Sequence, residues 1–379
     1  ATPRKEVGGS MKTPMSLPLF VFSCFVAFGL AAPSIAESQW DKAAAANYMD
    51  ERQAWWIDWP VAARDQNTAC QSCHTTVPYL LARPALRHVL GEVGPTLPEA
   101  RLISDTRKRV TMWNEVDPFY PDQTFGLPKS SESRGTEAIL NAFVLASRDA
   151  QEGYLASETM QAFENLWDLQ FTRGEGRGAW AWLYFDLAPW ESEGASYFGA
   201  ALAAVAVGMA PESYAESPEV QEPLSLLRAY LLEDWQERPT FDRLMLLWAG
   251  SELRGLVNPT DDNTILKDLE RLQNEDGGWS LAALRGWEGR EEYVPPTKSD
   301  GYATGLVAFV LQRAGVSKEQ ENVVRALDWL AHGQATDGRW PSTSLNRERD
   351  PESERGLIMS DAATAFAVLA LTEAQRTGR

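Results

Sequence analysis

A repeated pattern in the second half of the chain constrains the fold more than any other feature. A glutamine is followed by an Asp-Gly pair and then by a tryptophan, in residues 273–279 and again in residues 334–340. A looser copy, without the Asp-Gly pair, lies in residues 170–180. A repeat with a constant offset is typical of stacked structural units that bury one continuous core. The sequence therefore predicts a repeat architecture after about residue 135.

Two kinds of helical segment alternate in this part of the chain. Helices buried on both sides must be apolar all round, whereas helices at the surface carry a charged face. The inner candidates are residues 136–147, 196–209, 240–252, 301–314 and 361–373. The outer candidates are residues 158–169, 222–235, 262–272 and 318–332. Because no stretch alternates Val, Ile and Thr as a strand would, the prediction is an all-α fold.

Residues 325–330, followed by Gln334 and Trp340, resemble the QW repeat of the squalene and terpene cyclases. The resemblance covers residues 135–375, with one complete and two partial copies. In that family the glutamine caps a helix end and the tryptophan stacks against it, so both residues are structural. The resemblance implies an α/α toroid, an inner ring of helices surrounded by an outer ring. About five hairpins predict a small or incomplete toroid, with the N-terminal region as the candidate to close it.

Residues 70–74 read Cys-Gln-Ser-Cys-His, the pattern of a covalent c-type haem attachment site. The thiols of Cys70 and Cys73 would bind the haem vinyl groups, and His74 would be the proximal iron ligand. A disulfide pair, a redox-active dithiol and a chance match are the alternatives. We therefore expect one haem c in a small, irregular region rich in Trp and Pro, residues 37–134, that precedes the toroid of residues 135–379.

The sixth iron ligand is open at this point. Met112 lies downstream in the same region and has a thioether that binds iron in small cytochromes, but leucine-like packing explains it equally well. His88 is the other candidate, although neighbouring arginines favour a solvent-facing position for it. A five-coordinate iron is the third alternative.

The N-terminus carries the features of an export signal. Lys12 precedes an apolar run over residues 17–30, and small residues follow at positions 34–36. We expect a signal peptide within residues 1–36, with Met11 as the initiator, and a periplasmic or other extracytoplasmic mature protein. Cleavage would remove Cys24, and an uncleaved membrane anchor is the alternative. Haem is attached to such motifs outside the cytoplasm, so the two expectations agree.

The composition limits the partners. The formal net charge is −18, which repels nucleic acid and favours a basic partner. We therefore expect no nucleic-acid binding and a redox partner that is unidentified and possibly basic in charge.

The toroid lacks the acid motif of a protonating cyclase, D-x-D-D. Single acids, Asp300 and Asp361, stand at the starts of two inner helices, where they cap the helix or line a cavity. A Trp-rich loop that contains Asp186 and Glu191 could rim the same opening.

Two classes of function compete. The first is an exported haem protein for electron transfer or another redox reaction, with the toroid as a binding or docking module. The second is a cyclase-like enzyme with an accessory haem, acting on an isoprenoid or lipid; in either case the toroid cavity could hold a lipid, quinone or isoprenoid. A redox-inert scaffold with a disulfide is a third alternative, and enzymatic activity is left open.

Overall fold

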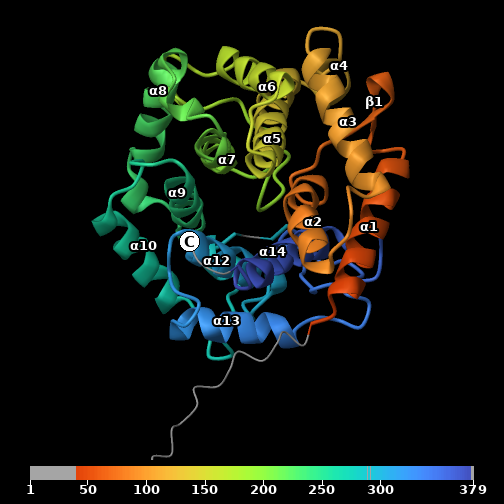
Figure 1. The fold of residues 1–379 in the computed structure, drawn as a ribbon, viewed down its shortest axis with the longest axis vertical. Helices are drawn as coiled ribbons and strands as arrows, with labels where there is room; N and C mark the ends of the chain where they lie inside the picture. Colours follow the sequence, from red (N-terminus) through yellow and green to blue (C-terminus); the bar gives the residue numbers. More distant parts are fainter. Residues whose placement is uncertain (1–39, 288, 291, 377–379) are drawn as a thin grey trace, which may run out of the picture. The chain divides into compact units, whose positions relative to one another are not determined.

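The computed structural model describes residues 40–287, 289–290 and 292–376, which belong to one compact unit. Within these residues, six helices form a closed inner ring and six others pack outside it (Figure 1). The inner ring consists of α2 (Thr76–Leu90), α5 (Lys129–Glu152), α7 (Ala195–Met209), α9 (Thr240–Glu252), α12 (Gly301–Arg313) and α14 (Ile358–Glu373). The outer ring consists of α1 (Lys42–Asp58), α3 (Leu97–Thr111), α6 (Ser157–Asp168), α8 (Gln221–Leu232), α10 (Pro259–Arg271) and α13 (Glu321–His332). The predicted all-α toroid is confirmed.

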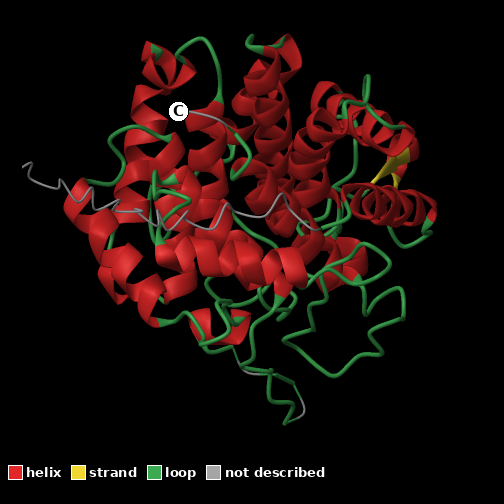
Figure 2. Cartoon of the chain, turned by 60° about the horizontal axis from the view of Figure 1, so that its bottom comes forward, coloured by secondary structure: helices red, strands yellow, loops and turns green. Residues whose placement is uncertain are grey.

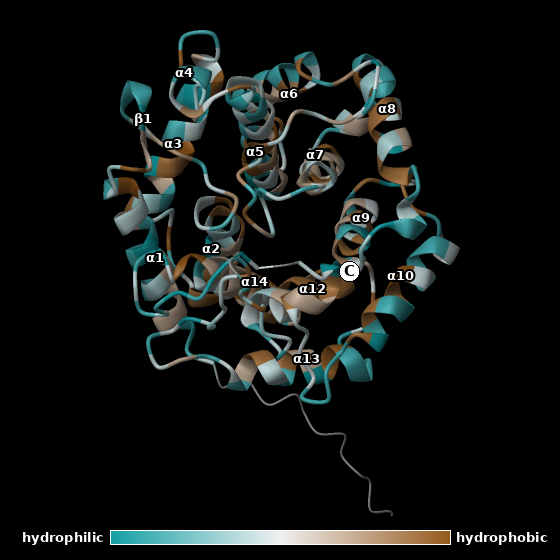
Figure 3. Ribbon diagram, turned by 180° about the vertical axis from the view of Figure 1, so that it is seen from behind, coloured by the Kyte–Doolittle hydropathy of each residue, from teal (hydrophilic) through white to brown (hydrophobic). Residues whose placement is uncertain are grey.

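The two rings differ in the way that the sequence predicts. Nearly every residue of α7 and α14 is buried, because each inner helix packs against two inner neighbours and an outer helix. The outer helix α13 buries one face, with Val323, Leu327 and Leu330, and exposes the other. Figure 3 shows this division, with hydrophobic residues on the core side of the outer helices and hydrophilic residues outside.

The repeated Gln and Trp residues join each repeat to the next. The indole N–H of Trp340 donates to the carbonyl of Leu330 at 2.7 Å, which satisfies the end of α13. The amide of Gln334 donates to the carbonyl of Gly338 at 3.0 Å and to that of Asp41 at 2.9 Å, just before α1. Corresponding bonds occur in the copies at residues 170–180 and 273–279. In the last copy the bond to Asp41 closes the ring.

The N-terminal part differs from the irregular region that we expected. It contributes α1, α2 and α3 to the two rings, with a short hairpin of β1 (Ala63–Arg64) and β2 (Thr68–Ala69). The expected start of the toroid, residue 135, lies inside α5. Pro84 lies inside α2, and a proline within a helix is a poor helix signal, which explains why the sequence pattern concealed this inner helix.

The remaining elements are short. They are α4 (Asp122–Phe125), α11 (Leu281–Arg285) and the 3₁₀ turns Asp65–Asn67, Tyr214–Glu216, Pro218–Val220 and Trp235–Glu237. Among the described residues, no helix is long and apolar enough to cross a membrane. The expected signal peptide and Cys24 lie outside the described residues.

Candidate functional site

The inner helices all begin at one end of the toroid, which we call the mouth. Long connections precede five of them. These connections are residues 59–75, 112–128, 169–194, 272–300 and 333–357. Figure 2 shows the long loops gathered below the helices in that view. Most connections at the opposite end are shorter, so the mouth is where side chains outside the helical scaffold converge.

The Cys-x-x-Cys-His segment forms the start of inner helix α2 at the mouth. The hydroxyl of Ser72 accepts hydrogen bonds from the backbone N–H groups of Thr75 and Thr76, at 3.2 and 3.0 Å, and so caps the helix. Cys70 is buried in a small apolar cluster with Trp56, Ala62 and Phe119. The half-buried Cys73 instead faces the axis of the toroid. Both cysteines are free thiols.

His74 is held by a chain of hydrogen bonds that reaches the core. The hydroxyl of Thr75 donates to the carboxylate of Asp361 at 2.9 Å, so its oxygen accepts from Nδ1 of His74 at 2.8 Å. This arrangement leaves the lone pair on Nε2. Burial and the nearby Arg52 lower the pKa of His74 to about 3, so the ring is neutral. Trp56 and Trp190 pack against the ring, with centroids at 5.3 and 5.7 Å.

The two candidates for a sixth iron ligand lie on two different helices. Met112 ends the outer helix α3, whereas His74 precedes the inner helix α2. His88 is exposed in the last turn of α2. Fourteen helical residues rise about 21 Å, so His88 lies at the end of the helix opposite His74.

Asp300 and Asp361 have structural roles. Asp300 caps α12 by accepting from the N–H groups of Tyr302 and Ala303, each at 3.0 Å, and from that of Leu281 at 2.7 Å. Asp361 accepts from the buried Arg52 at 2.7 Å and from the hydroxyl of Tyr48 at 2.9 Å. Asp300 also borders a pocket of about 240 Å³, whereas Asp361 is buried.

The axis of the toroid is filled by side chains. Residues that line the remaining space include Cys73, Phe143, Phe198, Trp248 and Phe366, and this space is about 10 Å³. Such a volume holds roughly one water molecule. An apolar ligand on the axis would have to displace these aromatic side chains.

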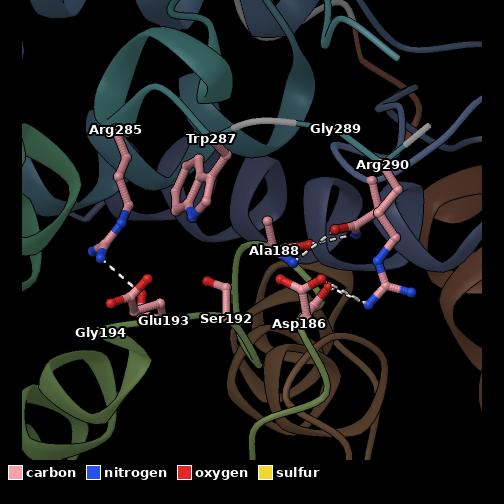
Figure 4. A pocket seen from close by; sticks show the side chains of 10 residues that line it. Asp186, Ala188, Ser192, Glu193, Gly194, Arg285, Trp287, Gly289 and Arg290 are labelled. Atoms are coloured by element: carbon pink, nitrogen blue, oxygen red, sulfur yellow. Dashed lines mark hydrogen bonds and ion pairs between the residues drawn. The ribbon is translucent and has the colours of Figure 1, made fainter. Parts of the chain in front are cut away.

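A larger pocket of about 680 Å³ opens at the mouth, and Figure 4 shows it from close by. We call it the mouth pocket. The loop before α7 supplies one wall, and the segment after α11 supplies the other. The lining side chains that could bind or react with a ligand are Asp186, Ser192, Glu193, Arg285, Trp287, Arg290 and Asn346.

Hydrogen bonds fix the two walls. Asn346 joins them, because its side chain bonds both backbone groups of Ala188, at 2.8 and 2.9 Å, and its carbonyl accepts from the N–H of Arg290. The guanidinium of Arg290 pairs with the carboxylate of Asp186 at 3.3 Å. Arg285 donates to the backbone carbonyl of Glu193 at 2.9 Å. The pocket is therefore preformed.

Two donors at this pocket lack a protein acceptor. The indole nitrogen of Trp287 and Nε of Arg290 have no hydrogen-bond partner among the described residues. In Figure 4 the indole nitrogen of Trp287 faces Ser192 and the opposite wall. Both atoms are buried, so a ligand with acceptor oxygens would reach them only after the surrounding side chains move.

Glu191 belongs to the same loop before α7 but does not line the mouth pocket. Glu191 and Leu187 form a tight hairpin, because their backbones exchange two hydrogen bonds, at 2.8 and 3.1 Å. The half-buried carboxyl has no hydrogen bond or ion pair among the described residues. Burial raises the pKa of Glu191 to about 7, and Lys129 opposes this only in part. A carboxyl of this kind is typical of a functional site.

The sequence located part of this region. It placed Asp186 and Glu191 at the rim of the toroid because of the Trp-rich loop that holds them. It missed Arg285, Trp287 and Asn346, which come from segments about 100 residues or more away. The sequence around these residues gives little indication of a binding site, since isolated charged and aromatic residues near glycines occur in many loops.

No protein-family model and no curated protein matches the sequence. A solved glycosidase variant shares 12% identity at a TM-score of 0.50, over 88% of this chain and 98% of that chain. A glycosidase variant in complex with glucose shares 12% identity at a TM-score of 0.48, over 88% and 97%. A polysaccharide lyase shares 12% identity at a TM-score of 0.37, over 89% and 90%.

These comparisons correct the expected family and function. The solved structure with a TM-score of 0.50 is a glycosidase, so the expected resemblance to squalene cyclases and to c-type cytochromes is wrong. The expectation of an electron-transfer haem protein, or of a cyclase-like enzyme, is contradicted with it. The described residues contain no group of His, Cys, Asp and Glu that could hold a metal ion. What this chain shares with its structural neighbours is the α/α toroid fold.

Proposed function

We propose that this protein is a carbohydrate-active hydrolase that binds a saccharide in the mouth pocket. The observation that carries the proposal is the composition of that pocket, an indole between fixed carboxylate, guanidinium and amide groups. A volume of about 680 Å³ lies within the range of small-molecule sites. The toroid fold, shared with a glycosidase at a TM-score of 0.50, is consistent with the proposal.

Each group suits a sugar. The apolar face of Trp287 can pack against the C–H face of a pyranose ring. The N–H groups of Trp287 and Arg290 are buried without a protein acceptor and could donate to hydroxyl oxygens once a bound sugar displaced what covers them, and Asn346 adds an amide nearby. Positive and negative groups alternate around the pocket, which favours a neutral ligand with many hydroxyls over a highly charged one.

Hydrolysis of a glycosidic bond uses two carboxyl groups. Asp186 is fixed at the pocket wall by its ion pair with Arg290, so it is the candidate for the base or nucleophile. Glu193 is exposed and forms no ion pair among the described residues, so it suits the proton donor.

The test is to incubate the protein with a panel of neutral oligosaccharides and to measure hydrolysis as the release of reducing ends. Asp186→Asn and Glu193→Gln should each lower kcat by about 10²–10⁴-fold, the usual contribution of an acid or base. Trp287→Ala should mainly raise KM. The matched control is Glu219→Gln, an exposed carboxylate in the connection after α7, at the opposite end of the toroid.

Two results would contradict the proposal. One is the absence of both binding and hydrolysis across the panel. The other is hydrolysis that Asp186→Asn and Glu193→Gln leave at the level of the Glu219→Gln control.

A further inference from the structure

A second pocket, of about 240 Å³, shares two chain segments with the mouth pocket. The helix α11 contributes Leu281 to the second pocket, and Arg285, its last residue, lines the mouth pocket. In the same way Thr343 lines the second pocket and Asn346 lines the mouth pocket. We propose that the second pocket binds one sugar unit of a polysaccharide whose chain also occupies the mouth pocket. This inference rests on the proposed function and narrows its substrate to a polymer.

Hydrogen bonds hold together the segments that line the two pockets. The hydroxyl of Tyr293 donates to the carbonyl of Ser344 at 3.2 Å, and the N–H of Arg290 donates to the carbonyl of Asn346 at 2.8 Å. Arg290 and Asn346 belong to the mouth pocket, and Ser344 lies between two lining residues of the second pocket. The two pockets are therefore held at a fixed separation, and both are formed before a ligand binds.

The half-buried indole of Trp329, on the outer helix α13, lines the second pocket. Its N–H donates to the carboxylate of Asp276 at 3.1 Å, which fixes the ring. Gly333 adds no side chain next to the ring, where a Cβ would lie 3.5 Å from Cζ3 of Trp329. The ring is thus held in place without being covered from that side. A fixed indole suits the apolar C–H face of a pyranose.

The second pocket also offers polar groups that are not fully used within the protein. The hydroxyl of Thr343 and the ammonium of Lys298 have no hydrogen-bond or ion-pair partner among the described residues. The hydroxyl of Ser342 donates to Asp300 at 3.2 Å and keeps lone pairs that can accept. A sugar hydroxyl both donates and accepts, so it matches this set. The volume lies below the roughly 300–1,000 Å³ of sites for drug-sized ligands, which suits a single sugar ring.

Two sugar sites on one rigid protein favour a polymer over its fragments. Once a sugar unit occupies the mouth pocket, binding of a later unit of the same chain in the second pocket is intramolecular. A chain that spans both pockets therefore binds more tightly than a fragment that fills only one. A disaccharide in the mouth pocket gains nothing from Trp329, whereas a polysaccharide does.

The experiment is electrophoresis of the protein through gels that contain a soluble glucan, mannan or xylan. Trp329→Ala should raise the Kd for the polysaccharide that retards the wild type by about tenfold or more. Thr343→Val should raise it severalfold, and its exposed position leaves folding intact. The matched control is Trp167→Ala, which removes a half-buried indole from the outer helix α6 that donates to Tyr214 at 2.9 Å and lines neither pocket.

Hydrolysis of the matching disaccharide separates this inference from the proposed function. In Trp329→Ala the ratio of kcat/KM for the polysaccharide to kcat/KM for the disaccharide should fall about tenfold, and Trp167→Ala should keep the wild-type ratio. Equal retardation of Trp329→Ala, Thr343→Val and Trp167→Ala would overturn the second site even where the disaccharide is hydrolysed. Retardation that depends on Trp329 without any hydrolysis would support the second site and contradict the hydrolase. A wild type that none of the three polysaccharides retards would overturn the second site.

Discussion

At the scale of single residues, the carboxyl groups near the mouth divide by the hydrogen bonds that they receive. Asp300 and Asp361 each accept several donors, which oppose the rise in pKa that burial causes. Glu191 receives none, so burial raises its pKa to about 7. The first two carboxylates hold the scaffold, and the third titrates in the neutral range.

This difference predicts a pH dependence of stability. In the unfolded chain Glu191 has its ordinary pKa of 4.5, against about 7 in the folded protein. Between these values the unfolded state binds fewer protons than the folded state, so stability falls as pH rises from about 4.5 to 7 and then levels off. Glu191→Gln should remove about 2–3 kcal/mol of this loss.

The measurement is the free energy of unfolding in urea at several pH values, for the wild type and Glu191→Gln. The difference between the two curves isolates this group from the other titrating residues. A constant difference from pH 4.5 to 8 would show that Glu191 titrates normally.

At the scale of elements, a glycine in each repeat turn allows the turn to dock on the next outer helix. Gly178, Gly277 and Gly338 all have φ between 90° and 100°. A Cβ on Gly338 would lie 2.2 Å from the carbonyl oxygen of Ala44 in α1. The turn therefore needs glycine twice, for its backbone conformation and for its close approach to a neighbour.

Gly338→Ala should lower the free energy of unfolding by about 3 kcal/mol or more, because it adds a backbone clash to the conformational strain. The control is Gly315→Ala, which has a similar φ of +84° but no atom within 4 Å of the added Cβ. That variant should cost about 1 kcal/mol. Equal losses in thermal or urea unfolding would mean that the contact with α1 contributes nothing.

At the scale of the whole molecule, the first and last helices close the ring. The inner helices α2 and α14 pack together, and the outer helix α1 lies against both. Arg52 of α1 bonds the buried Asp361 of α14 through Nε at 2.7 Å and through a second nitrogen at 3.1 Å. The first and last helices of the described chain are thus held together by both apolar packing and a buried ion pair.

Arg52→Met should lower the free energy of unfolding by about 3–5 kcal/mol, since it leaves the carboxylate of Asp361 buried without its cation. Adding Asp361→Asn should recover part of this loss. The control is Arg376→Met, whose exposed pair with Glu373 should contribute at most about 1 kcal/mol. Urea unfolding followed by circular dichroism measures all three, and a loss as small as that of Arg376→Met would exclude a closing role.

Much of the fold was predictable from the sequence alone. The Gln-to-Trp repeat and the apolar inner segments depend on local spacing and hydrophobicity, and these predicted the inner helices α7, α9 and α12 within a residue or two. Asp186 and Glu191 were predictable at the rim because one Trp-rich loop contains both. The assignment of Cys70, Cys73 and His74 to a haem site stays a prediction, since a short motif says nothing about what packs around it.

The sequence by itself therefore determined the helices, their inner or outer character and the Gln-Trp turns that join them. Only the tertiary structure decided that the N-terminal region supplies α2 as the sixth inner helix, that Ser72 caps it, and that Trp287 and Asn346 meet Asp186 in one pocket. The physical reason is that helix formation and amphipathicity depend on residues a few positions apart, whereas ring closure, burial of a carboxyl group and the walls of a pocket depend on segments brought together by packing.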